Sequence, residues 1–186
     1  MMRRIVAPIA LAAMALASFS AAQALPGQRL PVWLAWAKAN PVLQNLKHTT
    51  DEMSAGTIYN KHVKAGGMAF YFAAEPGYGD NGGPATIFGE NLALDGPPAG
   101  YDLRLHRAAA AKMAGVVYGP AIAADLLAAK VAGDFAIYQS TQRQQILKGK
   151  RYMYQVNGPG LTVSALSGLA EALKNAKICA TTECGD

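Results

Sequence analysis

The feature that most restricts the fold is an alanine-rich stretch at residues 108–132. Apolar residues occupy most of its helical circumference, which is typical of a helix buried inside a protein. Lys112 and Asp125 leave only 12 uncharged residues between them, whereas a membrane-spanning helix needs about 20. Gly119-Pro120 interrupts the stretch, because proline removes a backbone donor and kinks or restarts a helix. We therefore expect a broken, buried helix.

Strand-like segments flank this helix on both sides. Residues 67–75, "GMAFYFAAE", are nearly all apolar, as expected of a strand covered on both faces. A second strand is expected at residues 85–94, with Gly89 placed for a bulge. Residues 101–107, "YDLRLHR", alternate between apolar and polar side chains, which predicts a third strand. Two more strands are expected in residues 134–141 and 150–156.

Helices are expected at the two ends of the chain. Pro31 suits a first helical position, and Asn40-Pro41 predicts a cap and a second helix. Thr49 and Glu52 have capping-box spacing, so a third helical piece is expected towards Lys64. Residues 164–177 predict a last helix. The order predicts an α+β fold: a mainly antiparallel sheet of about five strands, in β-β-β-α-β-β order, covered by N-terminal, central and C-terminal helices.

The N-terminus has the three-part pattern of a secretory signal peptide. A basic start at residues 1–4 precedes an uncharged apolar run, and Ala22-Gln23-Ala24 then supplies the small residues of a cleavage site. Residues 1–24 are therefore expected to be a signal peptide, and residues 25–186 a single domain in the bacterial periplasm or outside the cell. An uncleaved anchor helix is the alternative, since residues 5–22 are just long enough to span a bilayer.

Charge and cysteine content limit the partners. Cleavage leaves 15 basic and 12 acidic residues, a net charge of +3 spread along the chain. This balance predicts no nucleic acid partner, and no membrane-spanning segment is expected after cleavage. Cys179 and Cys184 predict a disulfide in an exported chain. Their spacing does not fit a C-x-x-C metal or redox site, so no metal and no cofactor are predicted.

The Gly-rich stretch "QVNGPGLTVSALSGLAEAL" at residues 155–173 resembles a phosphate-binding loop only in outline. Gly158 and Gly160 lack the third glycine of G-x-G-x-x-G, and no P-loop lysine follows them. The stretch is better explained as the start of the last helix, with Ser164 as its cap. Its apolar stripe consists of Leu166, Leu169, Leu173 and Ala176.

No local pattern predicts catalysis. His48, His62 and His106 are isolated, and Ser167 lacks the first glycine of G-x-S-x-G. A hydrolase would have to assemble His62 or His106 with a serine or carboxylates from distant segments.

Two surfaces are candidates for contact with a partner. The loop of residues 75–84 carries Tyr78, Asp80 and Asn81, and its length exceeds that of common hairpin loops. Basic and aromatic side chains alternate in "LKGKRYMYQV", where Arg151, Tyr152 and Tyr154 could contact an anionic partner.

The strand followed by "SALSGLAEALKNAKIC" resembles the tail of small exported alphaproteobacterial proteins such as the invasion-associated locus B family. Gly168, Leu169, Ala172 and Leu173 match, and the resemblance covers about 25 of 186 residues. The internal cysteine pair of that family is missing, and the resemblance transfers no catalytic residue.

The sequence as a whole predicts a non-catalytic exported protein that binds another envelope component. The first alternative is a hydrolase with a spatially assembled site. The second uses residues 108–132 to bind a hydrophobic ligand or a membrane surface. The oligomeric state is not predicted.

Overall fold

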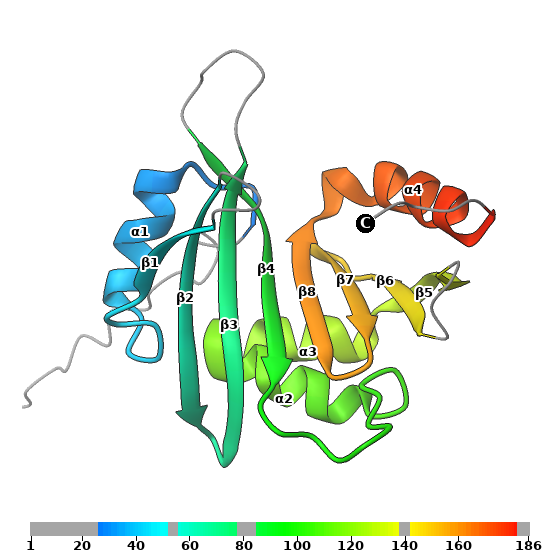
Figure 1. The fold of residues 1–186 in the computed structure, drawn as a ribbon, viewed down its shortest axis with the longest axis horizontal. Coiled ribbons are helices and arrows are strands. Elements are labelled where there is room, and N and C mark those ends of the chain that lie inside the picture. Colours follow the sequence, from blue (N-terminus) through cyan, green and yellow to red (C-terminus); the bar gives the residue numbers. More distant parts are fainter. Residues whose placement is uncertain (1–25, 52–55, 78–84, 138–141, 182–186) are drawn as a thin grey trace, which may run out of the picture.

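The computed structural model describes residues 26–51, 56–77, 85–137 and 142–181 (Figure 1). The helices are α1 (Leu30–Ala39), α2 (Arg107–Tyr118), α3 (Pro120–Ala128), the 3₁₀ turn η1 (Leu166–Gly168) and α4 (Leu169–Thr181). The strands are β1 (Lys47–Asp51), β2 (Gly56–Ala65), β3 (Met68–Gly77), β4 (Thr86–Leu94), β5 (Lys130–Ala136), β6 (Arg143–Lys148), β7 (Tyr152–Asn157) and β8 (Gly160–Ala165). Within the described ranges, no helix combines the length and apolar character that a membrane crossing requires.

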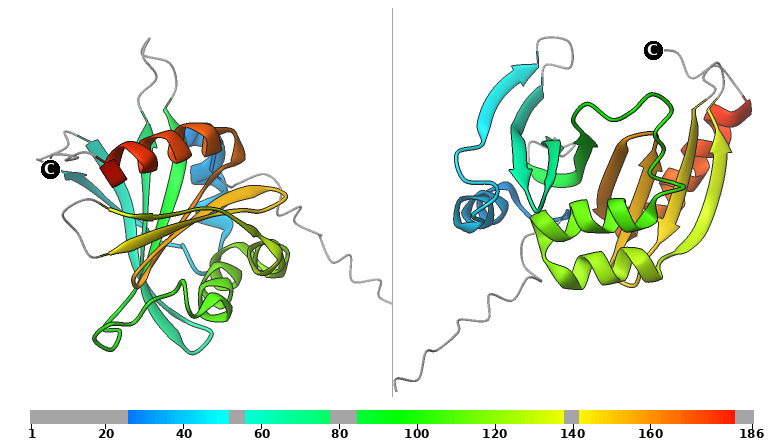
Figure 2. Two further views of the ribbon diagram at one scale, coloured as in Figure 1. Left: turned by 90° about the vertical axis from the view of Figure 1, so that its right-hand side faces the viewer. Right: turned by 90° about the horizontal axis from the view of Figure 1, so that it is seen from below.

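All strands in the described residues belong to one antiparallel sheet, in the order β1-β2-β3-β4-β8-β7-β6-β5. Two four-stranded meanders, β1–β4 and β5–β8, meet where β4 pairs with β8. The helices α2 and α3 connect the two meanders and lie against one face of the curved sheet (Figures 1 and 2). Helix α4 lies on the other face, over the second meander.

The main core fills the space between the sheet and helices α1, α2 and α3. Trp33 of α1 is fully buried and stacks on Phe72 of β3, with 6.4 Å between the ring centroids. Trp36 stacks on Tyr118 at the end of α2, with centroids 6.0 Å apart. These aromatic contacts fix α1 against both the sheet and α2, since stacked rings add to the stability gained from burying their area.

Several predictions are confirmed. The class is α+β, with an antiparallel sheet and helices. Helix α1 starts beside Pro31, and the alanine-rich stretch is helical as far as Ala128 and broken at Gly119-Pro120. The last part of the predicted helix was wrong, because residues 130–132 begin β5. The strands expected at residues 67–75 and 85–94 are β3 and β4. A bulge lies next to Gly89, because Glu75 pairs with Gly89 and Pro76 with Ile87.

The strand count and part of the order were wrong: the part of the chain that the structure describes forms a sheet of eight strands instead of about five. The helical piece expected from Thr49 towards Lys64 is the β1–β2 hairpin, in which Asn60 Nδ2 donates to Thr49 Oγ1 at 2.8 Å. Pairing along two strands satisfies more backbone groups than one capped helical turn. The helix expected after Asn40 is a short turn, although the Asn40 side chain does accept the Val42 N–H.

The strand expected at residues 101–107 was also wrong. Asp102 Oδ1 accepts the backbone N–H of Arg104 at 2.9 Å, which closes a local turn instead of a sheet ladder. Leu103 is buried, whereas Leu105 is 79% exposed. The alternating apolar residues of this segment therefore do not share one face that packs on the core. Ser164 lies in β8, not at a helix cap, and strands β6 and β8 were not predicted.

Candidate ligand groove

A groove of about 620 Å³ lies between α4 and the sheet. Helix α4 is on the face of the sheet that α2 and α3 leave uncovered (Figure 1). Its floor comes from β4, β5, β6, β7 and β8, and α4 forms one wall. The lining residues are Phe88, Gly89, Phe135, Ile137, Gln144, Met153, Gln155, Ser164, Ala165, Ser167, Gly168, Glu171, Ala172, Asn175, Ala176 and Cys179. The volume falls in the range of about 300–1,000 Å³ found for small-molecule sites.

The lining combines apolar side chains with a few polar ones. Phe88, Phe135 and Met153 supply aromatic rings and a thioether, while Gln144 and Gln155 supply amides that both donate and accept hydrogen bonds. Glu171 is the one charged residue among the described lining residues. This composition suits a molecule with an apolar body and a polar or cationic group.

Phe88 reaches the groove because of the bulge in β4. The register shift leaves Phe88 as the extra residue between the Glu75–Gly89 and Pro76–Ile87 pairs, and its side chain is 59% exposed. A Cβ on Gly77 would lie 2.0 Å from the Phe88 ring, so only glycine leaves the ring in this position. Bulges commonly re-aim a side chain beside a functional site.

A small cluster, separate from the main core, holds α4 on the sheet. Ile146, Met153 and Ala176 are its buried members. The predicted stripe is confirmed, because Leu166, Leu169 and Leu173 pack on this cluster. Only Ala176 of α4 is buried, so the helix covers the sheet incompletely and leaves the groove open beside it.

On the opposite side of β4, a buried carboxyl group lies inside the main core. Glu90 is fully buried, and its Oε1 accepts the Trp33 Nε1–H at 2.5 Å. Burial raises the pKa of Glu90 to about 7, although the Tyr118 hydroxyl and the Trp33 N–H both lower it. Neither Glu90 Oε2 nor the Tyr118 hydroxyl has a partner with good hydrogen-bond geometry. This group is enclosed, so it cannot contact a ligand.

A second buried carboxylate, Asp125 of α3, holds the turn between β6 and β7. Its oxygens accept the backbone N–H groups of Lys150 at 2.8 Å and Arg151 at 3.3 Å, and the Tyr154 hydroxyl at 2.7 Å. Burial and the hydrogen bond to Asp125 raise the pKa of Tyr154. A Cβ on Gly149 would lie 2.3 Å from Asp125 Oδ2, which explains glycine there.

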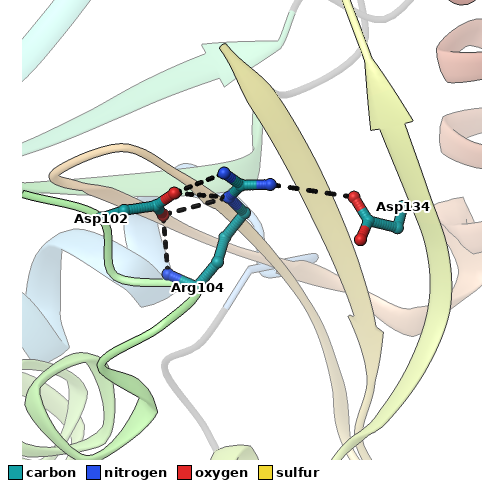
Figure 3. A network of polar contacts seen from close by, with 3 residues as sticks. All are labelled: Asp102, Arg104 and Asp134. Atoms are coloured by element: carbon teal, nitrogen blue, oxygen red, sulfur yellow. Dashed lines mark hydrogen bonds and ion pairs between the residues drawn. The ribbon is translucent and has the colours of Figure 1, made fainter. Parts of the chain in front are cut away.

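A third set of polar contacts ties the turn at residues 101–106 to β5 (Figure 3). The Arg104 guanidinium donates hydrogen bonds to the Asp102 carboxylate from Nε and Nη2, with Nε 2.8 Å from Oδ2. These hydrogen bonds lower the pKa of Asp102. Arg104 Nη1 also lies 3.9 Å from Asp134 Oδ1 on β5. These three side chains form a structural link, because their charged groups already pair with one another.

The structure separates the histidines from one another. His62 Nδ1 lies 3.1 Å from Asp95 Oδ2, His106 stacks on Tyr101, and His48 stacks on Tyr59. Among the described residues, no hydrogen bond joins a histidine to a serine. Nor does the described part of the chain gather three His, Cys, Asp or Glu side chains that could hold a metal ion.

The predicted partner-contact residues fall in different places. Tyr78, Asp80 and Asn81 lie outside the described residues, as do residues 1–24 and Cys184. Arg151 is exposed, Tyr152 is half-buried, and Tyr154 is fully buried in the core. Cys179 lies in α4 and lines the groove, and its pairing with Cys184 stays a prediction.

Four groove residues were not predicted from the sequence: Phe88, Phe135, Met153 and Glu171. They come from β4, β5, β7 and α4, so only the strand order brings them together. The one available signal was Gly89, which indicated a bulge beside an aromatic residue.

Comparisons with protein-family models, with curated proteins and with solved structures find no match to this chain. The resemblance to the invasion-associated locus B family therefore depends on the C-terminal residues alone. Gly168 closes η1 in the structure, while Leu169, Ala172 and Leu173 belong to α4.

Proposed function

We propose that the protein is an exported, non-catalytic binding protein that holds a small amphipathic component of the cell envelope in the groove beside α4. The observation that carries this proposal is the groove itself, a cavity of about 620 Å³ with an aromatic and aliphatic lining and few polar groups. Export is inferred from the signal-like pattern of residues 1–24.

The lining indicates the chemistry of the ligand. An apolar body would contact the rings of Phe88 and Phe135 and the side chain of Met153. Glu171 is exposed on α4, so a cationic or hydrogen-bond-donating group on the ligand is favoured over an anionic one. The amides of Gln144 and Gln155 would orient a polar group on the sheet side.

The groove offers little support for the hydrolase alternative. Ser164 and Ser167 are present, but the described lining contains no histidine that could act as their base. Binding requires only the apolar surface and the polar groups already present, so it is the function that these residues support best.

Titration with N-phenyl-1-naphthylamine, an apolar fluorescent probe with one N–H donor, tests this proposal. We expect saturable binding to the purified protein and at least a tenfold loss of affinity in Ala172→Phe, which places a ring in the groove. Leu105→Ala removes a side chain that is 79% exposed and does not line the groove, so its affinity should be unchanged. Equal probe binding in wild type and Ala172→Phe would contradict the proposal.

A further inference from the structure

The turn between β6 and β7 presents cations on a rigid backbone. Lys148, Lys150 and Arg151 are exposed. The Asp125 carboxylate accepts hydrogen bonds from the backbone N–H groups of Lys150 and Arg151. Because the backbone is held in this way, the three cationic side chains start from a defined position. Binding a partner would therefore cost less conformational entropy than binding through a mobile loop.

The fold adds two more cations from distant segments. Lys130, the first residue of β5, lies directly opposite Lys148 on β6. Arg107, at the start of α2, donates from Nη1 to the Ala129 carbonyl at 2.9 Å, next to Lys130. We define the basic corner as Arg107, Lys130, Lys148, Lys150 and Arg151.

The cations of the basic corner are not neutralised within the described part of the chain. None of the five takes part in an ion pair among the described residues. The neighbouring carboxylates are already engaged, since Asp125 is buried beneath the turn and Asp134 faces Arg104. Like charges directly opposite on paired strands, as in Lys130 and Lys148, destabilise a sheet. An anionic partner would remove that cost.

Two exposed apolar residues lie within three positions of Lys130 in the chain. Leu127 on the last turn of α3 is 51% exposed, and Val131 on β5 is 52% exposed. Both flank Lys130, and the buried Ala129 between them anchors the segment to the core. The end of α3, the start of β5 and the β6–β7 turn thus form one corner of the molecule (Figure 2).

We propose that the basic corner docks this protein on an anionic phospholipid surface, with Leu127 and Val131 entering the headgroup region. Cations alone would suit any polyanion, but exposed apolar residues on the same segments suit a surface that offers both negative charge and an apolar layer. The corner shares no residue with the groove, so the two proposals are independent.

Vesicle co-sedimentation tests this inference. Vesicles of equal parts phosphatidylglycerol and phosphatidylcholine should bind the purified protein, whereas phosphatidylcholine alone should not. Binding should weaken as salt is added, because exposed charges are screened. Each basic residue beside an anionic surface contributes about fivefold in affinity. The triple variant Lys148→Ala, Lys150→Ala, Arg151→Ala should therefore lose on the order of a hundredfold.

Matched variants separate the corner from general charge and hydrophobicity. Lys38→Ala, Lys174→Ala, Lys177→Ala removes three exposed cations elsewhere and should change binding only a few-fold. Leu127→Ser with Val131→Ser should weaken vesicle binding, whereas Val32→Ser with Ile178→Ser, each 46% exposed in the wild type, should not. Ala172→Phe should leave vesicle binding intact, which distinguishes this test from that of the groove.

Three results would overturn the proposal. Equal binding to neutral and anionic vesicles would remove the electrostatic basis. An equal loss in both triple variants would show that the corner has no special role. Tight binding of soluble polyphosphate, with no effect of Leu127→Ser and Val131→Ser on vesicles, would show that the corner binds a soluble polyanion instead.

Discussion

Trp33 Nε1 donates a hydrogen bond of 2.5 Å to Glu90 Oε1 in the interior of the protein, where both side chains are fully buried. The contact joins α1 to β4 across 57 residues of sequence. It also places an ionisable group beneath the strand that carries Phe88 on the groove side. The protonation of Glu90 is therefore coupled to the stability of the packing between α1, β4 and α2.

We predict that Glu90 makes the protein less stable at pH 8 than at pH 5. The folded protein holds this proton up to about pH 7, whereas the unfolded chain releases it near 4.5. The folded state therefore binds more protons between these values, and the free energy of unfolding falls as pH rises through them. Above pH 7, this difference in pKa lowers the free energy of unfolding by about 3 kcal/mol relative to pH values below 4.5.

Glu90→Gln should remove this part of the pH dependence, because the amide oxygen still accepts the Trp33 N–H but carries no charge. Urea unfolding at pH 5 and pH 8 measures the effect in both proteins. The variant should be more stable than wild type at pH 8 and close to it at pH 5. The same slope with pH in both proteins would contradict the assignment.

Trp33→Phe should raise the pKa of Glu90 above its wild-type value of about 7, because the Trp33 N–H favours the carboxylate. A carbon-13 NMR titration of the Glu90 carboxyl group measures this change directly. Loss of a hydrogen bond to a charged group costs about 1.5–3 kcal/mol, so the variant should lose more stability at pH 8 than at pH 5. An unchanged or lower pKa would exclude the role given to this hydrogen bond.

Gly149→Ala should destabilise the turn between β6 and β7. The added Cβ would lie 2.3 Å from Asp125 Oδ2 and 2.8 Å from Tyr154 Cε2, so the buried polar contacts beneath the turn must shift. Overpacking of this kind costs about 1–3 kcal/mol. Gly168→Ala is the matched control, because no atom lies within 4 Å of its Cβ position. Equal unfolding midpoints for both variants would refute this account of the turn.

Gly77→Ala should weaken ligand binding without a comparable loss of stability. Its Cβ would occupy the position of the exposed Phe88 ring, which must then leave its place in the groove. We expect the affinity for N-phenyl-1-naphthylamine to fall several-fold while the urea midpoint changes little, since Phe88 is not a core residue. A wild-type affinity in this variant would show that Phe88 does not contribute to binding.

Segments with strong local patterns could be predicted from the sequence, and segments defined by pairing could not. The break at Gly119-Pro120 and the apolar strand β3 each follow from a few adjacent residues. Thr49 and Glu52 suggested a helix start, but Thr49 pairs with Ile58 across a hairpin. Strand pairing depends on a partner strand elsewhere in the chain. A local capping pattern such as Thr49 and Glu52 therefore does not decide whether a segment forms a helix or a strand.

The candidate sites were less predictable than the fold. The groove required strands β6 and β8, which were not expected, and a bulge that exposes Phe88. The basic corner required Arg107 and Lys130 to approach the turn at Lys150, whereas in sequence the same charges appear evenly spread. Only the order of the strands shows that the groove residues lie together, and the same is true of the cations of the basic corner.

Native mass spectrometry of the protein purified from bacterial periplasm tests the central claim most directly. We predict a bound small molecule on the wild-type protein, released on activation, and absent from Ala172→Phe purified in the same way. A wild-type protein that carries no small molecule and gives the same spectrum as Ala172→Phe would contradict the claim that the groove beside α4 is a ligand site.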